Sequence, residues 1–299
     1  MKRLICSLDE RKIPYRLNEP MKLYTTFKTG GPAKLFVTPR DEDELKEVLL
    51  LCKDNGTETF ILGKGSNLLI SDEGLDKAVI YIGENFDYIK EIDECTFEAG
   101  AGASVASICK FALSKSLTGL EFAYGIPGSV GGAAYMNAGA YGGEVKDVIE
   151  SCRHVSIDGE SGVFTEKELD FSYRHSAYSD AGYVITAVVF HLEKGDKNLI
   201  EETMRDIISR RKDKQPLEYP SAGSVFKRPE GYFAGALIEQ SDLKGKRIGG
   251  AMVSEKHAGF IINYDNATTT DVLELIRFCQ RTVKEKFGVD LETEIKFIS

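Results

Sequence analysis

Apolar residues recur at helical spacing in four segments of the chain. We predict helices within residues 38–56, 104–116, 198–216 and 269–288. In the first segment carboxylates occupy the first turn and Gly56 follows the last apolar residue, so the charges match the helix dipole. Ser104 stands where the second helix needs an N-cap, and Pro216 ends the third.

Short runs rich in β-branched and aromatic residues alternate with these helices and predict strands. They are residues 57–62, 77–82, 95–100, 154–159 and 183–193. The last contains a run from Tyr183 to Phe190 that is apolar except for Thr186, which indicates a strand buried on both faces. The alternation predicts a mixed α/β architecture up to about residue 195.

The character of the chain changes after residue 196. There a helix with a basic C-terminal end precedes a new set of motifs, so we predict a boundary within residues 196–216. The length of 299 residues is about twice that of a usual domain and agrees with more than one folded unit.

The charge balance and the cysteines exclude several classes of protein. The formal net charge is −9 and no basic stretch is interleaved with aromatic residues, so nucleic acid is not an expected partner. Charges interrupt the N-terminal segment before an apolar region forms, and no apolar run is long enough to span a bilayer; we expect a cytoplasmic protein without membrane insertion. The six cysteines have no C-x-x-C pair and no histidines at metal-ligand spacing, so we expect reduced thiols and no metal site.

Two glycine-rich loops are the strongest chemical signal. The sequence GKGSN at 63–67 follows a predicted strand, where backbone amides can hold a phosphate, although a plain turn explains it equally well. Residues 119–143 contain eight glycines and five alanines, which allow the backbone to approach a large ligand; tight turns under close packing are the alternative. Two such loops in one α/β unit suggest a dinucleotide, either FAD or NAD.

The segment SAGSVFKRP at 221–229 presents Ser224 before two cations. This serine is a candidate nucleophile, phosphate ligand, proton donor or turn residue. No G-x-S-x-G elbow surrounds it, which disfavours a serine hydrolase, although a histidine brought close by folding would restore that alternative. Cys152 and His154 share a strand face but do not by themselves form a catalytic pair.

The order of these motifs resembles the UDP-N-acetylenolpyruvoylglucosamine reductase family, in its shorter type II form. The resemblance is carried by residues 26–39, 61–70, 125–144, 173–176, 221–229, 249–263 and 291–297. It implies an FAD-binding fold of the vanillyl-alcohol oxidase type with a smaller α/β substrate-binding C-terminal domain. The division that follows is an FAD-binding region at 1–200, with subdomains at about 20–75 and 76–200, and a substrate-binding domain at 201–299 whose last strand returns to the flavin.

The resemblance also implies a reaction. NADPH reduces non-covalently bound FAD, and the reduced flavin then reduces the enolpyruvyl ether of a UDP-sugar to UDP-N-acetylmuramate, a step of peptidoglycan precursor synthesis. We expect a monomer whose partners are this UDP-sugar and NADPH. An FAD-dependent oxidase or dehydrogenase of a small alcohol or sugar on the same fold is the first alternative, and a nucleotide-binding protein without catalysis is another.

Three residues acquire catalytic roles through the resemblance. Arg174 engages the substrate carboxylate, Ser224 protonates C2, and Glu294 assists the enolate, with Glu292 the alternative by spacing. The substrate-binding candidates are Tyr173, Lys227, Arg228, Lys256 and His257, of which His257 is equally well explained as a structural histidine. Lys227 and Arg228 are expected to favour a transient alkoxide at Ser224.

The implied cofactor-binding residues lie in the two glycine-rich loops. They are Gly63, Lys64, Gly65, Ser66, Asn67 and Leu68 in the first loop, and Gly125, Pro127, Gly128, Ser129, Gly131, Gly132, Ala133, Asn137 and Gly139 in the second. The sequence departs from the family pattern at Arg228, where longer members have Asn, and at Ser241-Asp242, which replace a more usual small residue.

Overall fold

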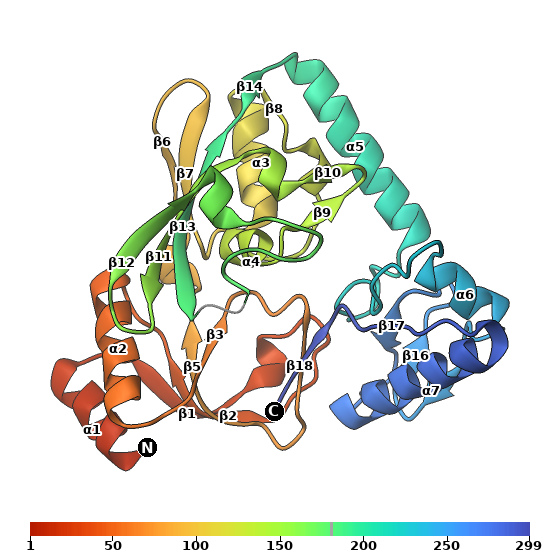
Figure 1. The fold of residues 1–299 in the computed structure, drawn as a ribbon, viewed down its shortest axis with the longest axis horizontal. Coiled ribbons are helices and arrows are strands. Elements are labelled where there is room, and N and C mark those ends of the chain that lie inside the picture. The colour runs from red at the N-terminus through yellow and green to blue at the C-terminus, as the bar shows by residue number, and fades with distance from the viewer. Residues whose placement is uncertain (180–181) are drawn as a thin grey trace. The chain divides into compact units, whose positions relative to one another are not determined.

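The computed structural model describes residues 1–179 and 182–299 (Figure 1). The chain separates into two compact units. The first unit contains Met1–Leu17, Leu35–Lys64 and Lys77–Ser209, and the second contains Asn18–Lys34, Gly65–Asp76 and Arg210–Ser299. The division falls inside three strands, β1 (Tyr15–Pro20), β2 (Pro32–Val37) and β5 (Leu75–Tyr81). The predicted domain limits at residue 200 stay a prediction.

The N-terminal part forms a four-stranded sheet in the order β1-β2-β5-β3, in which β3 (Thr59–Leu62) runs parallel to β5. Helix α2 (Glu42–Asp54) confirms the first predicted helix, and the Asp41 side chain accepts from the Glu44 amide as its N-cap. Helix α1 (Lys2–Arg11) was not predicted, because charged residues dominate it. Its signal is the pair Leu4 and Leu8, which lie one turn apart and are fully buried.

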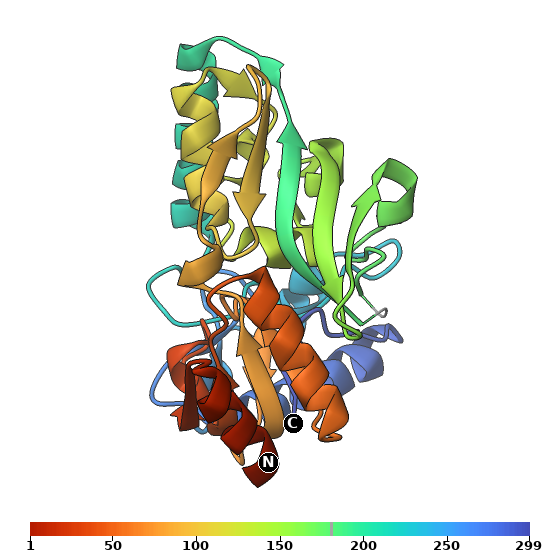
Figure 2. The ribbon, with the colours of Figure 1, turned by 90° about the vertical axis from the view of Figure 1, so that its left-hand side faces the viewer.

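A second sheet has five strands, each antiparallel to its neighbour (Figure 2). Its order is β12 (Ser161–Thr165), β11 (Ile149–Ser156), β13 (Tyr183–His191), β7 (Thr96–Gly100) and β6 (Ile89–Glu91). Residues Val184 to Val188 of the central strand β13 are all buried, which confirms the prediction from its apolar run.

Helices and short strands complete the first unit. They are α3 (Val105–Ser114), α4 (Val130–Tyr135), α5 (Lys197–Lys214), whose last residues fall in the second unit, and the pairs β8 (Leu117–Thr118) with β14 (Glu193–Lys194) and β9 (Gly139–Ala140) with β10 (Gly143–Glu144). Ser104 caps α3 as predicted, since its hydroxyl accepts from the Ser107 amide at 2.9 Å.

Cys152 and His154 are core residues of this five-stranded sheet. Burial raises the pKa of the Cys152 thiol to about 12, so it is protonated at neutral pH. His154 Nδ1 contacts the Tyr178 hydroxyl at 3.0 Å, and that hydroxyl donates to the Cys152 carbonyl. The His154 ring also packs against the rings of Phe164 and Tyr183. These contacts explain both residues without catalysis.

The second unit contains a three-stranded antiparallel sheet and two helices. The sheet order is β15 (Arg247–Ile248), β16 (Ala251–Val253) and β17 (Ile261–Asn263), and the helices are α6 (Ala234–Gln240) and α7 (Thr269–Phe287). The apolar stripe from Val272 to Val283 on α7 is buried, which confirms that prediction. Thr268 and Asp271 form a capping box at the start of α7. Strand β4 (Leu68–Ile70) pairs in parallel with β18 (Lys296–Ile298).

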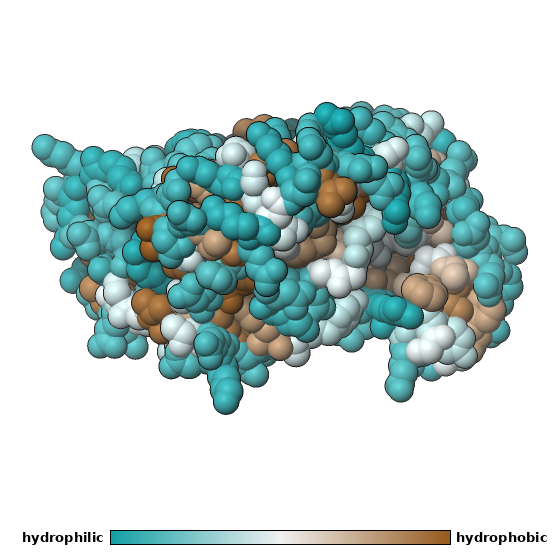
Figure 3. All heavy atoms as spheres, turned by 90° about the horizontal axis from the view of Figure 1, so that it is seen from above, coloured by the Kyte–Doolittle hydropathy of each residue, from teal (hydrophilic) through white to brown (hydrophobic). Residues whose placement is uncertain are grey.

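Three further properties of the described residues concern membranes, metal ions and the surface. No helix of the described residues is long and apolar enough to cross a membrane, and within the same residues no cluster of three His, Cys, Asp or Glu could hold a metal ion. The face seen in Figure 3 is mostly hydrophilic, with apolar residues scattered over it. All six cysteines are free, and four of them, Cys52, Cys109, Cys152 and Cys279, are buried.

Candidate active site

Ser224 lies in a short extended segment of the second unit. Gly223 before it has φ +78°, a left-handed conformation that costs glycine least, so this turn sets the direction in which the segment starts. Ser224 then forms an antiparallel bridge with Phe260, and the Val225 amide donates to the Gly259 carbonyl at 2.9 Å. The Ser224 hydroxyl makes a long contact of 3.4 Å with the Phe226 carbonyl. Its position therefore depends mainly on the backbone around it.

The segment that contains Glu294 pairs with the other edge of the Ser224 segment. Phe226 bridges Thr293, the Glu294 amide donates to the Val225 carbonyl at 2.7 Å, and the Lys227 amide donates to the Glu292 carbonyl at 2.9 Å. The backbones of two predicted catalytic residues, Ser224 and Glu294, are thus neighbours in a small antiparallel ladder. Glu294 is half-buried, whereas Glu292 is exposed and forms an ion pair with Lys227.

The end of the first glycine-rich loop joins the same ladder. The Asn67 side-chain amide donates to the Glu294 carbonyl at 3.1 Å, and the Asn67 carbonyl accepts from the Lys296 amide at 3.0 Å. Leu68 follows as the first residue of β4, opposite Lys296 in β18. The structure therefore brings together residues that are predicted to bind the cofactor and one that is predicted to act on the substrate.

Position 65 in this loop requires glycine because its neighbours leave no room for a side chain. It has φ +57°, and a methyl group there would collide with the Tyr24 carbonyl oxygen. Its carbonyl accepts from the Thr26 amide at 3.2 Å. Of the other loop residues, Lys64 is exposed and Ser66 is half-buried.

Two threonine hydroxyls beside this loop were not predicted as site residues. Thr26 Oγ1 and Thr29 Oγ1 are both buried and have no hydrogen-bond partner within the described part of the chain. A buried hydroxyl without a partner costs about 1–3 kcal/mol, so the segment that pairs with Gly65 fits a polar ligand well. The motif TTFKTGG does not reveal by itself which of its hydroxyls are unpaired, so the structure was needed to identify these two threonines.

Within the first unit, the start of the first glycine-rich loop lies against the second loop. A methyl group on Gly63 would lie 2.5 Å from Ser129 Oγ, so the start of the first loop contacts the second. Ser129 also caps α4, since its hydroxyl accepts from the Gly132 amide at 3.3 Å. Pro127 and Gly132 are exposed in this loop, while Ser129 and Ala133 are buried.

Several glycines of the second loop serve the packing of the protein itself. A methyl group on Gly131 would lie 2.8 Å from Ala101 Cβ, and one on Gly143 would lie 2.6 Å from the Phe122 ring. Gly125 and Gly128 have φ of +90° and +146°, conformations that other residues rarely adopt. Close packing and tight turns, the alternative that the sequence left open, thus explain part of this glycine surplus.

Arg174 lies at the tip of a tight turn in the first unit. Ser172 and His175 exchange backbone hydrogen bonds of 3.1 and 3.2 Å around Tyr173 and Arg174. Arg174 has φ +56°, which costs a residue other than glycine about 1–2 kcal/mol, and such strain is common at functional sites. Its Nη1 and Nη2 atoms both lie 3.5 Å from the Gly139 carbonyl, at the end of the second glycine-rich loop.

Asn137 fixes this turn to the glycine-rich loop. It is fully buried, and its amide nitrogen donates to the Ser172 carbonyl at 3.0 Å and to Glu144 at 3.1 Å. Its carbonyl oxygen accepts from the Lys146 amide at 3.2 Å. The hydrogen bond from the Lys146 ammonium is the main reason why the pKa of the Glu144 carboxyl lies below its ordinary value. Burial opposes this shift, and the hydrogen bond from the Asn137 amide adds to it. The cofactor contact predicted for Asn137 stays a prediction.

The predicted substrate-binding residues have defined neighbours. Lys227 pairs with Glu292, Lys256 lies 3.7 Å from Glu218, and Arg228 stacks 4.1 Å above the ring of the exposed Phe233. Tyr173 is 54% exposed. The influence of the two cations on the Ser224 hydroxyl stays a prediction.

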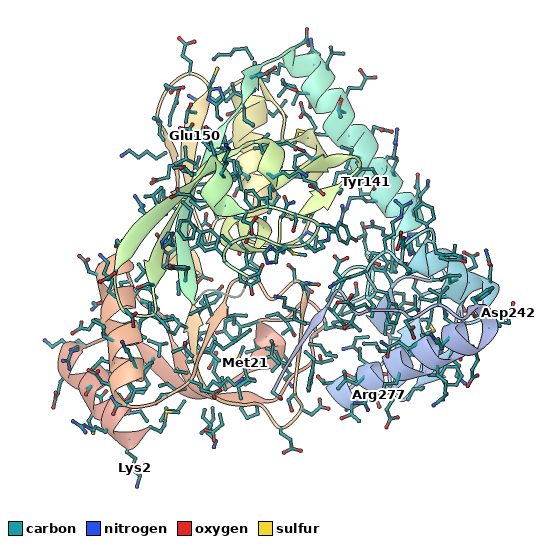
Figure 4. The ribbon with its side chains drawn as sticks, viewed as in Figure 1. Lys2, Met21, Tyr141, Glu150, Asp242 and Arg277 are labelled. Atoms are coloured by element: carbon teal, nitrogen blue, oxygen red, sulfur yellow. The ribbon has the colours of Figure 1, made fainter. Side chains whose placement is uncertain are left out.

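The departure at Ser241-Asp242 falls at the end of α6. Ser241 is buried and its hydroxyl donates to the Leu237 carbonyl at 2.8 Å. Asp242, labelled in Figure 4, has φ +59° and lies 3.3 Å from Lys286. Both residues therefore serve to terminate this helix.

Both parts of the chain are similar to known proteins. Residues 33–162 match the family model "FAD binding domain", so the chain is an FAD-binding protein, and residues 215–298 match "UDP-N-acetylenolpyruvoylglucosamine reductase, C-terminal domain". The UDP-N-acetylenolpyruvoylglucosamine reductase of Clostridium botulinum strain 657 is 50% identical over 94% of this chain and 92% of its own length, and that of Listeria welshimeri is 48% identical over 96% of both. The crystal structure of the Thermus caldophilus enzyme covers 96% of this chain and 99% of its own, with a TM-score of 0.81 and 36% identity. The chain belongs to the UDP-N-acetylenolpyruvoylglucosamine reductase family.

This finding confirms three predictions from the sequence. The resemblance, the fold class of an FAD-binding domain followed by a distinct C-terminal domain, and the assignment as an oxidoreductase are all correct.

Proposed function

We propose that the protein reduces UDP-N-acetyl-3-O-(1-carboxyvinyl)-glucosamine to UDP-N-acetylmuramate with NADPH, through FAD. The observation that carries this proposal is the ladder that joins Ser224, Glu294 and Asn67, in which a hydroxyl, a carboxyl and the end of a glycine-rich loop lie on adjacent backbones. The names of the similar proteins from Clostridium botulinum and Listeria welshimeri support the same substrate.

We assign FAD to the two glycine-rich loops. The contact between Gly63 and Ser129 and the unpaired hydroxyls of Thr26 and Thr29 support this assignment. Non-covalently bound FAD supplies the hydride acceptor and donor of the reaction. The residues that hold it are the loop residues predicted from the sequence, together with Thr26 and Thr29.

Ser224 delivers a proton to C2 of the substrate. Reduction of the enol ether at its terminal methylene leaves negative charge at C2, conjugated with the carboxylate, so a proton donor must stand at that carbon. A serine hydroxyl is a weak acid. To act as a proton donor it must be held in a fixed position, and a neighbouring group must replace the proton that it gives up. The backbone ladder on both sides of Ser224 supports this role, because it fixes the backbone that carries the hydroxyl.

Arg174 and Glu294 act on the substrate carboxylate and its enolate form. The guanidinium is a permanent fork of donors that matches a carboxylate, and it lies 3.5 Å from the Gly139 carbonyl in the second glycine-rich loop. Glu294 stabilises the enolate as a hydrogen-bond donor, which requires its carboxyl to be protonated. Tyr173, Lys227, Arg228 and Lys256 are assigned to the diphosphate and uridine of the UDP-sugar. Glu292 is less suited to the enolate because Lys227 already pairs with it.

Spectroscopy of the purified protein tests the function directly. We expect FAD absorbance that NADPH bleaches, followed by reoxidation on anaerobic addition of the UDP-enolpyruvyl sugar. A colourless protein that takes up no FAD would contradict the cofactor assignment. A flavin that NADPH reduces but the sugar does not reoxidise would favour an oxidase of a small alcohol or sugar instead.

The proposal includes the organisation of the chain. We assign residues 1–200 to FAD binding and 201–299 to the substrate, in a monomer. Sedimentation of the FAD-loaded protein tests the monomer, and binding of the UDP-sugar to an isolated 201–299 segment that folds would support the second limit.

A further inference from the structure

Ser224 and His257 flank Gly259. A methyl group built on Gly259 would lie 3.3 Å from Ser224 Oγ, 3.2 Å from His257 Nδ1 and 3.0 Å from His257 Cε1. The hydroxyl and the imidazole therefore both lie against the same point beside the Gly259 backbone. This proximity makes His257 a candidate partner for Ser224, which the spacing of the two residues in the sequence did not decide.

The hydrogen bond at Nδ1 defines the state of the His257 imidazole. The Gly259 amide donates to Nδ1 at 3.1 Å, so Nδ1 carries no proton and the neutral ring carries its proton on Nε2. A serine nucleophile needs this histidine as its general base. An Nδ1 already occupied by a backbone amide does not serve that purpose, so the geometry favours another role.

Burial keeps this imidazole neutral. Desolvation lowers the pKa of His257 below its ordinary value. The charged groups that act on the ring are Lys244, which lowers this pKa further, and Glu239, which opposes it, and these two pair with each other at 2.6 Å.

The turn closed by His257 holds the backbone of Ser224. The Phe260 amide donates to the His257 carbonyl at 3.0 Å, and Ser254 Oγ accepts from the His257 amide at 3.3 Å. Gly259 and Phe260, the next residues of this turn, are the ones that pair with Val225 and Ser224. The imidazole thus accepts from the Gly259 amide, and the Gly259 carbonyl accepts from the Val225 amide in the Ser224 segment.

We propose that His257 is a positioning residue for Ser224: its unprotonated Nδ1 closes the turn at Gly259 and thereby holds the Ser224 hydroxyl where it protonates the substrate. This inference rests on the proposed role of Ser224 as the proton donor. Protonation of His257 turns Nδ1 from an acceptor into a donor that faces the Gly259 N–H, and the turn loses its hydrogen bond. Proton delivery is therefore present above the pKa of His257 and lost as the pH falls through it.

Two variants of His257 separate the acceptor from the ring. In His257→Asn the side-chain oxygen takes the place of Nδ1, whereas His257→Ala removes the acceptor. We expect His257→Ala to slow reoxidation of NADPH-reduced flavin by the UDP-enolpyruvyl sugar about 100-fold, the cost of a small misplacement of a reacting group, with flavin reduction by NADPH unchanged. His257→Asn should reoxidise at close to the wild-type rate and lose the acid limb of the pH profile. His191→Asn is the control, because His191 Nδ1 also bonds a neighbour, Thr96, but far from Ser224 in sequence and in a different unit.

A third variant tests the same geometry if His257→Ala does not fold. Gly259→Ala places a methyl group tightly between ring and hydroxyl, and should slow reoxidation while retaining FAD. Wild-type reoxidation in both His257→Ala and Gly259→Ala would overturn the positioning role, as would equal slowing in His257→Asn and His257→Ala. If the sugar fails to reoxidise even the wild-type flavin, the proposed function itself is wrong, and this inference with it.

Discussion

The side-chain amide of Asn67 donates to the backbone carbonyl of Glu294 at 3.1 Å, across 227 positions of sequence. This bond joins a loop predicted to hold the cofactor to a residue predicted to act on the substrate. Since the same Asn67 also accepts from the Lys296 amide, the end of the chain is held at two points.

Asn67→Ala should disturb substrate chemistry more than flavin reduction. Loss of the bond releases the Glu294 backbone, so we expect reoxidation by the sugar to fall about tenfold, the equivalent of one hydrogen bond, in enzyme saturated with FAD. Stopped-flow absorbance at the flavin band measures both half-reactions. Asn85→Ala is the matched control, because the Asn85 amide also donates to a backbone carbonyl, that of Pro39, at 3.0 Å.

Ser224→Ala should leave flavin reduction by NADPH intact. Only the second half-reaction needs a proton at C2, so we expect reoxidation to slow by about 100-fold or more, as for loss of a general acid. Ser241→Ala removes a comparable hydroxyl from a helix end and should change stability but not this ratio. Equal slowing of both half-reactions by Ser224→Ala would show that the hydroxyl is not the proton donor.

Glu294→Gln should be milder than Glu294→Ala. The amide retains a hydrogen-bond donor for the enolate, whereas alanine removes it. The measurement is the rate of flavin reoxidation at saturating sugar, with Glu292→Gln as the control on the same segment. If glutamine is the more damaging substitution, Glu294 acts as an anion and the assigned protonation state is wrong.

Replacement of Arg174 by glycine should impair activity without lowering stability. Glycine adopts φ +56° without the strain that a Cβ atom causes there, so Arg174→Gly should leave the free energy of unfolding unchanged or raise it by up to about 1 kcal/mol. The same variant should raise the KM for the UDP-sugar and slow reoxidation, because the carboxylate loses its donor fork. Denaturant unfolding and steady-state kinetics check the two effects, and Arg174→Lys separates charge from geometry. A clear loss of stability in Arg174→Gly would show that its contact with the Gly139 carbonyl matters more than the strain.

Much of the fold was predictable because it depends on local pattern. The helices at α2, α3, α5 and α7 and the buried strand β13 follow from periodicity, caps and apolar runs. Helix α1 was missed, since only Leu4 and Leu8 mark its buried face in a charged segment.

The site was predictable in its motifs but not in its contacts. Family resemblance pointed to Ser224 and Glu294, yet the pairing of their segments joins residues far apart in the chain. The same holds for His257, whose proximity to Ser224 arises because Phe260 bridges Ser224. Position 131 needs a small residue because Ala101 lies against it, a contact that no local pattern reveals.

Two adjacent glycines can separate packing from cofactor binding in the second loop. Gly131 and Gly132 both lie in α4, but a methyl group on Gly131 meets Ala101 Cβ at 2.8 Å. Among the described residues outside the α4 backbone, the nearest atom to a methyl group on Gly132 is Ser129 Oγ, at 3.3 Å. We expect Gly131→Ala to lower the free energy of unfolding by about 1–3 kcal/mol through overpacking.

Gly132→Ala should leave the FAD-free protein as stable as the wild type or slightly more so, because alanine favours a helix by up to about 1 kcal/mol. If the exposed backbone at Gly132 lies against FAD as assigned, the added methyl group weakens FAD affinity about tenfold, measured by fluorescence titration of the apoprotein. Unchanged affinity in Gly132→Ala would remove Gly132 from the cofactor site. Because the fold is unaffected in that variant, the loss of affinity reports cofactor contact rather than the packing that Gly131 provides.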